Sequence, residues 1–305
     1  MRHPQQGMAL AELLVSMGLG LAVLLAAATL MVTANAAYVA QAESASAEEG
    51  ARYALDMLAR AVRQAGYVDW EGPAAGADDT APARIAGLDA RTLSKATAGI
   101  DGALAGAVNG SDVLALRFAG AGDPPDGDAS VLSCAGFAVH RHEEGWSIFY
   151  VARSAEGQPE LRCKYKGATG WGADAVLAGV ESFQVLYGLD TDAAPDGVPN
   201  RYLNASAIVA LDAALVLSGS SARDREDDLH RRTWWKRVAS VQVALLLRGA
   251  RTRVPVRATY ALFGPGYVNE DDPGTLLSDD ALSVGGHAEH RLFTTTVALR
   301  NGVRR

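Results

Sequence analysis

Glu12 is the first residue whose chemistry stands out, because it is the only ionisable side chain between Met8 and Ala34. This apolar run of about 27 residues exceeds the ~20 that a helix needs to span a bilayer. A carboxylate in hydrocarbon costs roughly 3 kcal/mol on insertion scales, so acids within membranes usually have a partner. The run therefore predicts a membrane helix in which Glu12 forms a specific pair.

A free amine at Met8 would supply the partner of Glu12. Cleavage after Gly7 would place the α-ammonium of Met8 about one helical turn away, or opposite the Glu12 of a staggered neighbouring chain. An ion pair in a low dielectric is strong when its desolvation is compensated and costly when one partner is missing. Such a pair would set the register between packed subunits. The alternatives are a secretory signal peptide, whose apolar region is only about 7–15 residues long, and a plain anchor, which leaves Glu12 unexplained.

A second group of polar side chains lies in the stretch 188–202, where oxygen ligands surround a tight turn at Gly197. They are Asp190, Asp192, Asp196 and Asn200. Calcium is the ion that such ligands suit. The match to an EF-hand loop is poor, because the third acid and Gly197 come two places late and Arg201 replaces the final glutamate. A solvated acidic turn is the alternative, and the sequence requires no cofactor.

Other function classes find little support. The sequence has no P-loop, no G-x-S-x-G and no zinc signature, so it predicts a protein that is not an enzyme. The formal net charge of −7 gives the whole chain no electrostatic footprint for nucleic acid. The stretch 223–237 mixes bases, acids and two tryptophans, and we interpret it as a mobile loop followed by a packed aromatic anchor. A partner-binding or DNA-contacting patch is the sharper alternative, although its acids weigh against DNA.

The elements that must position these groups begin with one long helix. From Asn35 to Ala65 there is no proline, and apolar residues recur every three or four positions, which gives an amphipathic face. Gly66 follows as a C′ residue. The sequence therefore predicts a helix from Met8 to Ala65, with its first half in lipid and its second half on a partner surface.

The rest of the chain changes to a strand-like period. Seven segments show partial alternation with β-branched and aromatic residues, and Gly/Pro/Asp clusters separate them. The segments are 111–119, 146–154, 160–166, 179–190, 238–248, 253–262 and 290–301. With 49% apolar residues the chain can bury a sizeable core. We expect an α+β fold in which the long helix packs on an antiparallel β-rich head.

The N-terminal stretch "QQGMALAELLVSMGLGL" resembles the leader and helix of type IV pilins and pseudopilins. Met8 departs from the phenylalanine that is usual at the new N-terminus. The resemblance implies that a prepilin peptidase cuts the Gly7–Met8 bond and methylates the amine of Met8. It divides the chain into a leader (1–7), a transmembrane half-helix (8–34), an amphipathic half-helix (35–66) and a globular head (67–305).

Five segments, the first at the end of the long helix and the others in the head, are similar to the PilW family of minor pilins, and they follow the family's order along the chain. They are "EEGARYALDMLARAVRQAGY" (48–67), "GSDVLALRF" (110–118), "GVESFQVLYGLDTD" (179–192), "WKRVASVQVALLLR" (235–248) and "FTTTVALRN" (293–301). The resemblance implies a subunit that starts in the inner membrane with a periplasmic head and ends at the pilus tip. Its implied partners are other minor pilins, the major pilin and a PilY-type adhesin. A type II secretion pseudopilin and a DNA-uptake pilin are the alternatives.

Cys134 and Cys163 are the two cysteines of the chain. In a head exported to the periplasm they would meet an oxidising environment, which favours a disulfide. Two buried thiols, or a metal half-site with His140 and His142, are the alternatives. A bridge that closes a loop of about 30 residues would contribute on the order of 3 kcal/mol.

Overall fold

The computed structural model describes residues 10–69, 79–125, 127–251, 258–267, 271–282 and 288–301. The chain divides into two compact units, Met1–Ser46 and Ala47–Arg305. Helix α1 (Leu10–Gln64) begins in the first unit and ends in the second. Gly7 and Met8 lie outside the described residues, so the predicted cleavage site stays a prediction.

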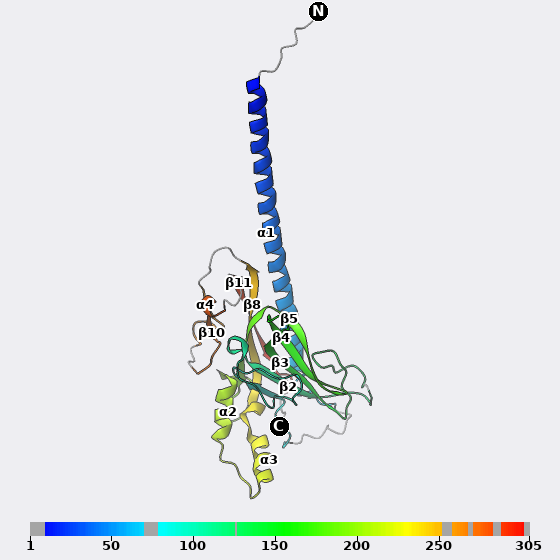
Figure 1. Cartoon of the computed structure of the whole chain (residues 1–305). Helices are drawn as coiled ribbons and strands as arrows, with labels where there is room; N and C mark the ends of the chain where they lie inside the picture. Colours follow the sequence, from blue (N-terminus) through cyan, green and yellow to red (C-terminus); the bar gives the residue numbers. More distant parts are fainter. Residues whose placement is uncertain are drawn as a thin grey trace, which may run out of the picture. The chain divides into compact units, whose positions relative to one another are not determined.

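The first unit consists of the N-terminal part of α1 (Figure 1). Its most apolar window has a mean hydropathy of 2.3, and none of that window is buried. Leucine, valine and methionine side chains cover its surface from Leu10 to Val39, and most of them are exposed by more than 60%. This part of the helix is long and apolar enough to cross a membrane.

In the second unit the apolar face of α1 becomes buried. Ala51, Ala54, Leu58 and Val62 are each 0% exposed, at the helical spacing that the sequence predicted. The helix stops before Gly66, which adopts a φ of +72° that favours glycine. The amide of Gly66 then donates to the carbonyl of Arg117 at 2.9 Å, so the chain turns directly onto a strand.

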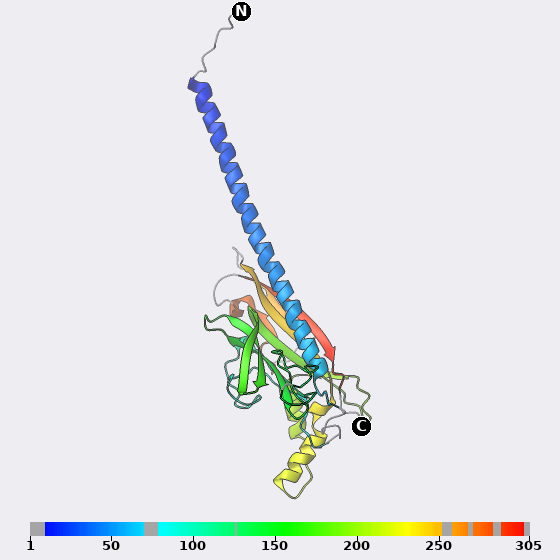
Figure 2. The ribbon, with the colours of Figure 1, turned by 90° about the vertical axis from the view of Figure 1, so that its right-hand side faces the viewer.

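Two antiparallel sheets form most of the second unit (Figure 2). The five-stranded sheet has the order β1 (Ile85–Leu88), β2 (Val113–Ala119), β3 (Glu144–Arg153), β4 (Pro159–Gly167) and β5 (Gly170–Ala178). The four-stranded sheet has the order β11 (Ala288–Ala298), β8 (Val238–Arg251), β6 (Val180–Leu189) and β7 (Arg201–Leu203). A two-stranded sheet pairs β10 (Leu276–Ser278) with β9 (Thr259–Ala261).

The buried core joins α1 to both larger sheets. Leu58 of α1, Phe149 of β3 and Phe183 of β6 belong to one apolar cluster, and each is 0% exposed. The α+β fold with a long N-terminal helix and an antiparallel β-rich head is therefore confirmed. Six of the seven expected strands are present with shifted ends, whereas 253–262 keeps only β9, since 252–257 lie outside the described residues.

Short helices fill the connections. They are η1 (Val108–Gly110), α2 (Ala205–Ala213), α3 (Ala222–Arg232), η2 (Trp234–Arg237) and α4 (Asp279–Leu282). The interpretation of 223–237 as a mobile loop was wrong for its first part, which is helix α3. A capping box between Ser221 and Asp224 starts this helix, and three basic residues occupy its last turn. The aromatic anchor is present, because Trp235 is buried against Tyr187 with their rings 4.9 Å apart.

Candidate functional site

The exposed apolar surface of α1 is the first candidate interaction surface. Glu12 lies in the first turn of the described helix and is the acid of that apolar run. Apolar side chains further along the same helix, such as Leu14, Leu24 and Met31, have most of their area exposed. Contiguous apolar surface of this extent marks a membrane or protein interaction site. The structure therefore gives Glu12 the apolar setting that the sequence predicted.

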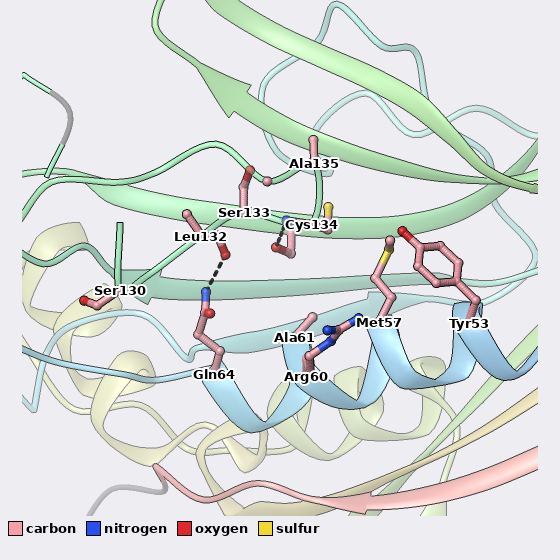
Figure 3. A pocket seen from close by; sticks show the side chains of 12 residues that line it. Tyr53, Met57, Arg60, Ala61, Gln64, Ser130, Leu132, Ser133, Cys134 and Ala135 are labelled. Atoms are coloured by element: carbon pink, nitrogen blue, oxygen red, sulfur yellow. Dashed lines mark hydrogen bonds between the residues drawn. The ribbon is translucent and has the colours of Figure 1, made fainter. Parts of the chain in front are cut away.

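A groove in the second unit lies between α1 and the loop 130–136 (Figure 3). Its volume is about 380 Å³. Tyr53, Met57 and Arg60 line it from the helix, and Figure 3 shows the loop facing them. The side-chain amide of Gln64 donates to the carbonyl of Leu132 at 2.8 Å and closes one end. A mixed aromatic, thioether and guanidinium lining suits a protein partner.

The predicted disulfide holds this loop. Cys134 and Cys163 are bonded, and their sequence separation is 29. Cys134 is also fixed by its backbone amide, which donates to the Ser147 hydroxyl on β3 at 2.9 Å. The bond joins the loop to β4, so the alternatives of free thiols and a cysteine–histidine metal site do not apply to these cysteines.

The acidic turn 188–202 is folded by its own hydrogen bonds. Asp190 is 2% exposed, and its two carboxylate oxygens accept the backbone amides of Asp192 at 3.1 Å and Gly197 at 2.8 Å. The Gly197 amide is the main reason that the pKa of Asp190 is lowered. Asn200 accepts the amide of Thr191 at 2.6 Å.

One oxygen from each of Asp190, Asp192 and Asp196 lies within 4.8 Å of the others. The structure thus brings the predicted ligands together. It also shows that backbone amides already use the carboxylate oxygens of Asp190. Calcium at this turn stays a prediction.

Sequence reasoning missed a second acidic cluster, formed by Asp89, Asp112 and Asp272. Asp89 follows β1 and Asp112 precedes β2, and these two strands pair with each other. The strand pattern could have indicated that the two acids are close. Asp272 comes from a segment about 160 residues further on, and no sequence signal placed it there.

The second half of the chain matches a known protein family. The family described as type IV pilus-assembly protein W matches residues 148–301, which is half of the chain. The chain belongs to the PilW family. The matched part begins in β3, includes β4 to β11 and ends at Asn301.

The chain is also similar to a solved pilin structure. A type IV-like pilin from Thermus thermophilus is 17% identical, with a TM-score of 0.34, and the alignment covers 84% of this chain and 98% of that chain. No curated protein matches the chain. Membership of the PilW family makes this chain a structural component related to the type IV pilus, with a helix suited to a membrane.

Proposed function

We propose that this PilW-family chain is a minor pilin that primes assembly of the type IV pilus and forms part of the complex at its tip. The observation that carries the proposal is the exposed apolar half of α1, in which Glu12 is the one acid. A bilayer covers such a surface before assembly. Packed helices of other minor pilins and of the major pilin cover it afterwards.

Processing gives Glu12 its partner in this proposal. Prepilin peptidase cuts the Gly7–Met8 bond and methylates the new amine. The ammonium of Met8 then pairs with the Glu12 carboxylate of its own or a neighbouring chain in a low dielectric, where an unpaired carboxylate is costly. The pair favours one stagger between neighbouring helices over the others.

The head carries the contacts that distinguish one minor pilin from another. Tyr53 lines the groove between α1 and the disulfide-bonded loop and is 53% exposed, and Phe137, which follows the loop residue Gly136 in the sequence, is 52% exposed. Exposed aromatic side chains at a groove are frequent anchors of protein interfaces. We assign this surface to neighbouring minor pilins, and support of a PilY-type adhesin to the assembled tip.

The family match favours the pilus over the type II secretion system, since its description names pilus assembly. DNA uptake has less support, because the net charge is −7 and the four acids of α3 offset its four arginines. The head is therefore proposed as a protein-binding module.

Intact-mass analysis of the membrane-extracted chain, with and without the prepilin peptidase, tests the processing step. We expect loss of residues 1–7 and gain of one methyl group only when the peptidase is present. Retention of the leader would contradict the proposal. So would cleavage near Asn35.

Recruitment tests the role of Glu12. Glu12→Gln should insert into the membrane normally, and its recovery with the other minor pilins should fall by about tenfold or more, because a lost pair of 1.4 kcal/mol already gives that factor. Glu43→Gln is the matched control, since it removes the same charge from α1 outside the apolar run. Equal recovery of both variants would contradict the register role.

A further inference from the structure

Three carboxylates from distant segments meet inside the second unit. Asp89, Asp112 and Asp272 each bring one oxygen within 4.8 Å of the others. Asp112 is 1% exposed and Asp272 is 3% exposed. The salt bridges of the described residues involve other acids. Two like charges 4 Å apart repel by about 4 kcal/mol at an effective dielectric of 20. Burial raises the pKa of Asp112 and of Asp272, so the group is stabilised either by protons on its carboxyls or by a bound cation.

The backbone fixes two of these carboxylates. In the β1–β2 pair, Leu88 lies opposite Val113, so Asp89 and Asp112 stand side by side just past its end. The two oxygens of Asp112 accept the backbone amides of Ala90 at 3.1 Å and of Val185 at 2.9 Å.

Asp89 is held in the same way by α2. Its oxygens accept the backbone amides of Ala205 at 2.9 Å and Ser206 at 2.7 Å, in the first turn of that helix. The two carboxylates are thus preorganised by four backbone donors. Each oxygen keeps a further lone pair with which it can bind a ligand.

Asp272 brings an oxygen that no donor satisfies. Its Oδ2 accepts the Tyr267 hydroxyl at 2.7 Å. Its Oδ1 is buried and has no hydrogen-bond partner in the part of the chain that the structure describes. A buried acceptor without a partner costs about 1–3 kcal/mol, which points to a ligand.

Tyr187 of β6 adds a second orphaned oxygen. The residue is 1% exposed, and its hydroxyl lacks a partner among the described residues. The hydroxyl lies against Gly87 of β1, two residues before Asp89, where a side-chain carbon on Gly87 would collide with it. Burial raises the pKa of this phenol first, and the nearby charges of Asp112, Asp89 and Asp272 raise it further.

We propose that Asp89, Asp112, Asp272 and the Tyr187 hydroxyl form a binding site for a calcium ion. Calcium is a hard cation that takes six to eight oxygen ligands at about 2.3–2.6 Å. Opposite ligands of one ion then lie about 4.6–5.2 Å apart, which accommodates oxygens within 4.8 Å of one another. Magnesium needs about 2.0–2.1 Å in a near-ideal octahedron and usually keeps several waters, so a site of protein oxygens favours calcium.

The ion has a structural role at this position. It ties the segment around Asp272 to the end of the β1–β2 pair and to the start of α2. The ligands come from both larger sheets, since Tyr187 belongs to β6 of the four-stranded sheet and Asp112 precedes β2 of the five-stranded sheet. The site is separate from the cluster formed by Asp190, Asp192 and Asp196.

Thermal unfolding of the full chain in detergent micelles tests the site. Divalent ions are first removed with a chelator, and calcium is then added to about 5 mM. This concentration exceeds the dissociation constants of 10⁻⁴–10⁻³ M that extracellular calcium modules show, so it should raise Tm by about 5 °C. The same concentration of magnesium should raise Tm by less than about 1 °C. Asp272→Asn should abolish the calcium shift, because it removes a charged ligand at constant size and at the oxygen that lacks a partner. Asp196→Asn, in the exposed turn, is the matched control and should keep the shift.

The other outcomes overturn the proposal. They are no calcium shift in the natural chain, an equal shift with magnesium, a shift kept in a folded Asp272→Asn variant, and a shift lost in Asp196→Asn. If Asp272→Asn does not fold, a second measurement takes its place. Terbium is bound to the Asp196→Asn variant, and its emission is excited through the aromatic side chains. Calcium should displace that emission, and a signal that calcium does not displace overturns the site.

Discussion

Asn301 caps the C-terminus of α1, although about 240 residues separate the two in the sequence. Its side-chain amide donates to the carbonyl of Arg63 at 3.1 Å and to that of Ala65 at 3.3 Å. The last carbonyls of a helix have no partner within it, and they carry the negative end of its dipole. A residue after the last strand therefore completes the C-terminus of the first helix.

Substitution of Asn301 should weaken this closure. Asn301→Ala removes the donor and should lower the free energy of unfolding by about 1 kcal/mol. Asn301→Asp should cost more, because its carboxylate faces the helix carbonyls and the negative end of the dipole. Chemical denaturation of both variants measures the difference. If Asn301→Asp were as stable as the natural chain, the side chain would have no capping role.

The disulfide should contribute through the unfolded state. Replacing both Cys134 and Cys163 by serine should lower the free energy of unfolding by about 3 kcal/mol, as a loop with a sequence separation of 29 predicts. A reductant should destabilise the natural chain similarly and leave the double variant unchanged. A double variant of natural stability would contradict this contribution.

Gly120 tests a close approach between backbones. A Cβ at this position would collide with the carbonyl groups of Val139 and His140, which belong to the backbone and cannot rotate away. Gly120→Ala should therefore cost about 2 kcal/mol or more. Gly266→Ala is the control, since nothing lies within 4 Å of its added carbon, and it should change stability by less than about 0.5 kcal/mol. Equal stability of the two variants would argue against the close contact.

Much of this architecture could be predicted from periodicity. The spacing of Ala51, Leu55, Leu58 and Val62 predicted the buried face of α1, and glycine at 66 predicted its end. The cysteine pair could be predicted from its expected compartment. The helix features depend on local sequence patterns, and the disulfide could be predicted because the chain has only two cysteines.

Features that depend on tertiary contacts could not be predicted. Strand β5 reads "GWGADAVLA", with two glycines and little alternation, and it forms because β4 offers an open edge. Helix α3 was taken for a loop because its mean composition is strongly polar, although its caps were visible at Ser221 and Asp224. Asp272 joined Asp89 and Asp112 only through the packing of distant segments.

The stability of α3 should depend on pH through Asp228. Its carboxylate accepts the backbone amide of Ser218 at 2.8 Å and the guanidinium of Arg232 at 3.1 Å, and these donors hold its pKa below the ordinary value. A carboxyl whose pKa is lowered by folding stabilises the fold above the unfolded pKa of about 3.9. This contribution is lost as the pH falls through the lower, folded pKa.

Asp228→Asn should consequently lower Tm at pH 7, and the difference from the natural chain should shrink as the pH falls below about 3.9. Thermal unfolding across this range measures it. Asp227→Asn, next to it in the same helix and only half-buried, is the control and should leave Tm nearly unchanged. A difference for Asp228→Asn that stayed constant with pH would show that charge is not the cause.

Lys164 should be the cation on which the five-stranded sheet depends most. It is 0% exposed on β4, and its ammonium donates to the carbonyls of Ser94 at 3.0 Å and Gly99 at 2.8 Å and to the Thr97 hydroxyl at 3.2 Å. The ammonium also lies 5.3 Å from the centre of the Trp171 ring. One side chain thereby holds the segment 94–99 against the sheet.

Lys164→Met keeps the length of the side chain and removes the three donated hydrogen bonds. Bonds from charged donors are worth about 1.5–3 kcal/mol each, and removal of a charge from a buried site offsets part of this, so we expect a net loss of about 2 kcal/mol. Hydrogen exchange should accelerate most between residues 94 and 99. Lys166→Met, two positions along β4 and more exposed, is the matched control and should leave that exchange unchanged. Unaltered protection of 94–99 in Lys164→Met would mean that apolar packing alone holds the segment.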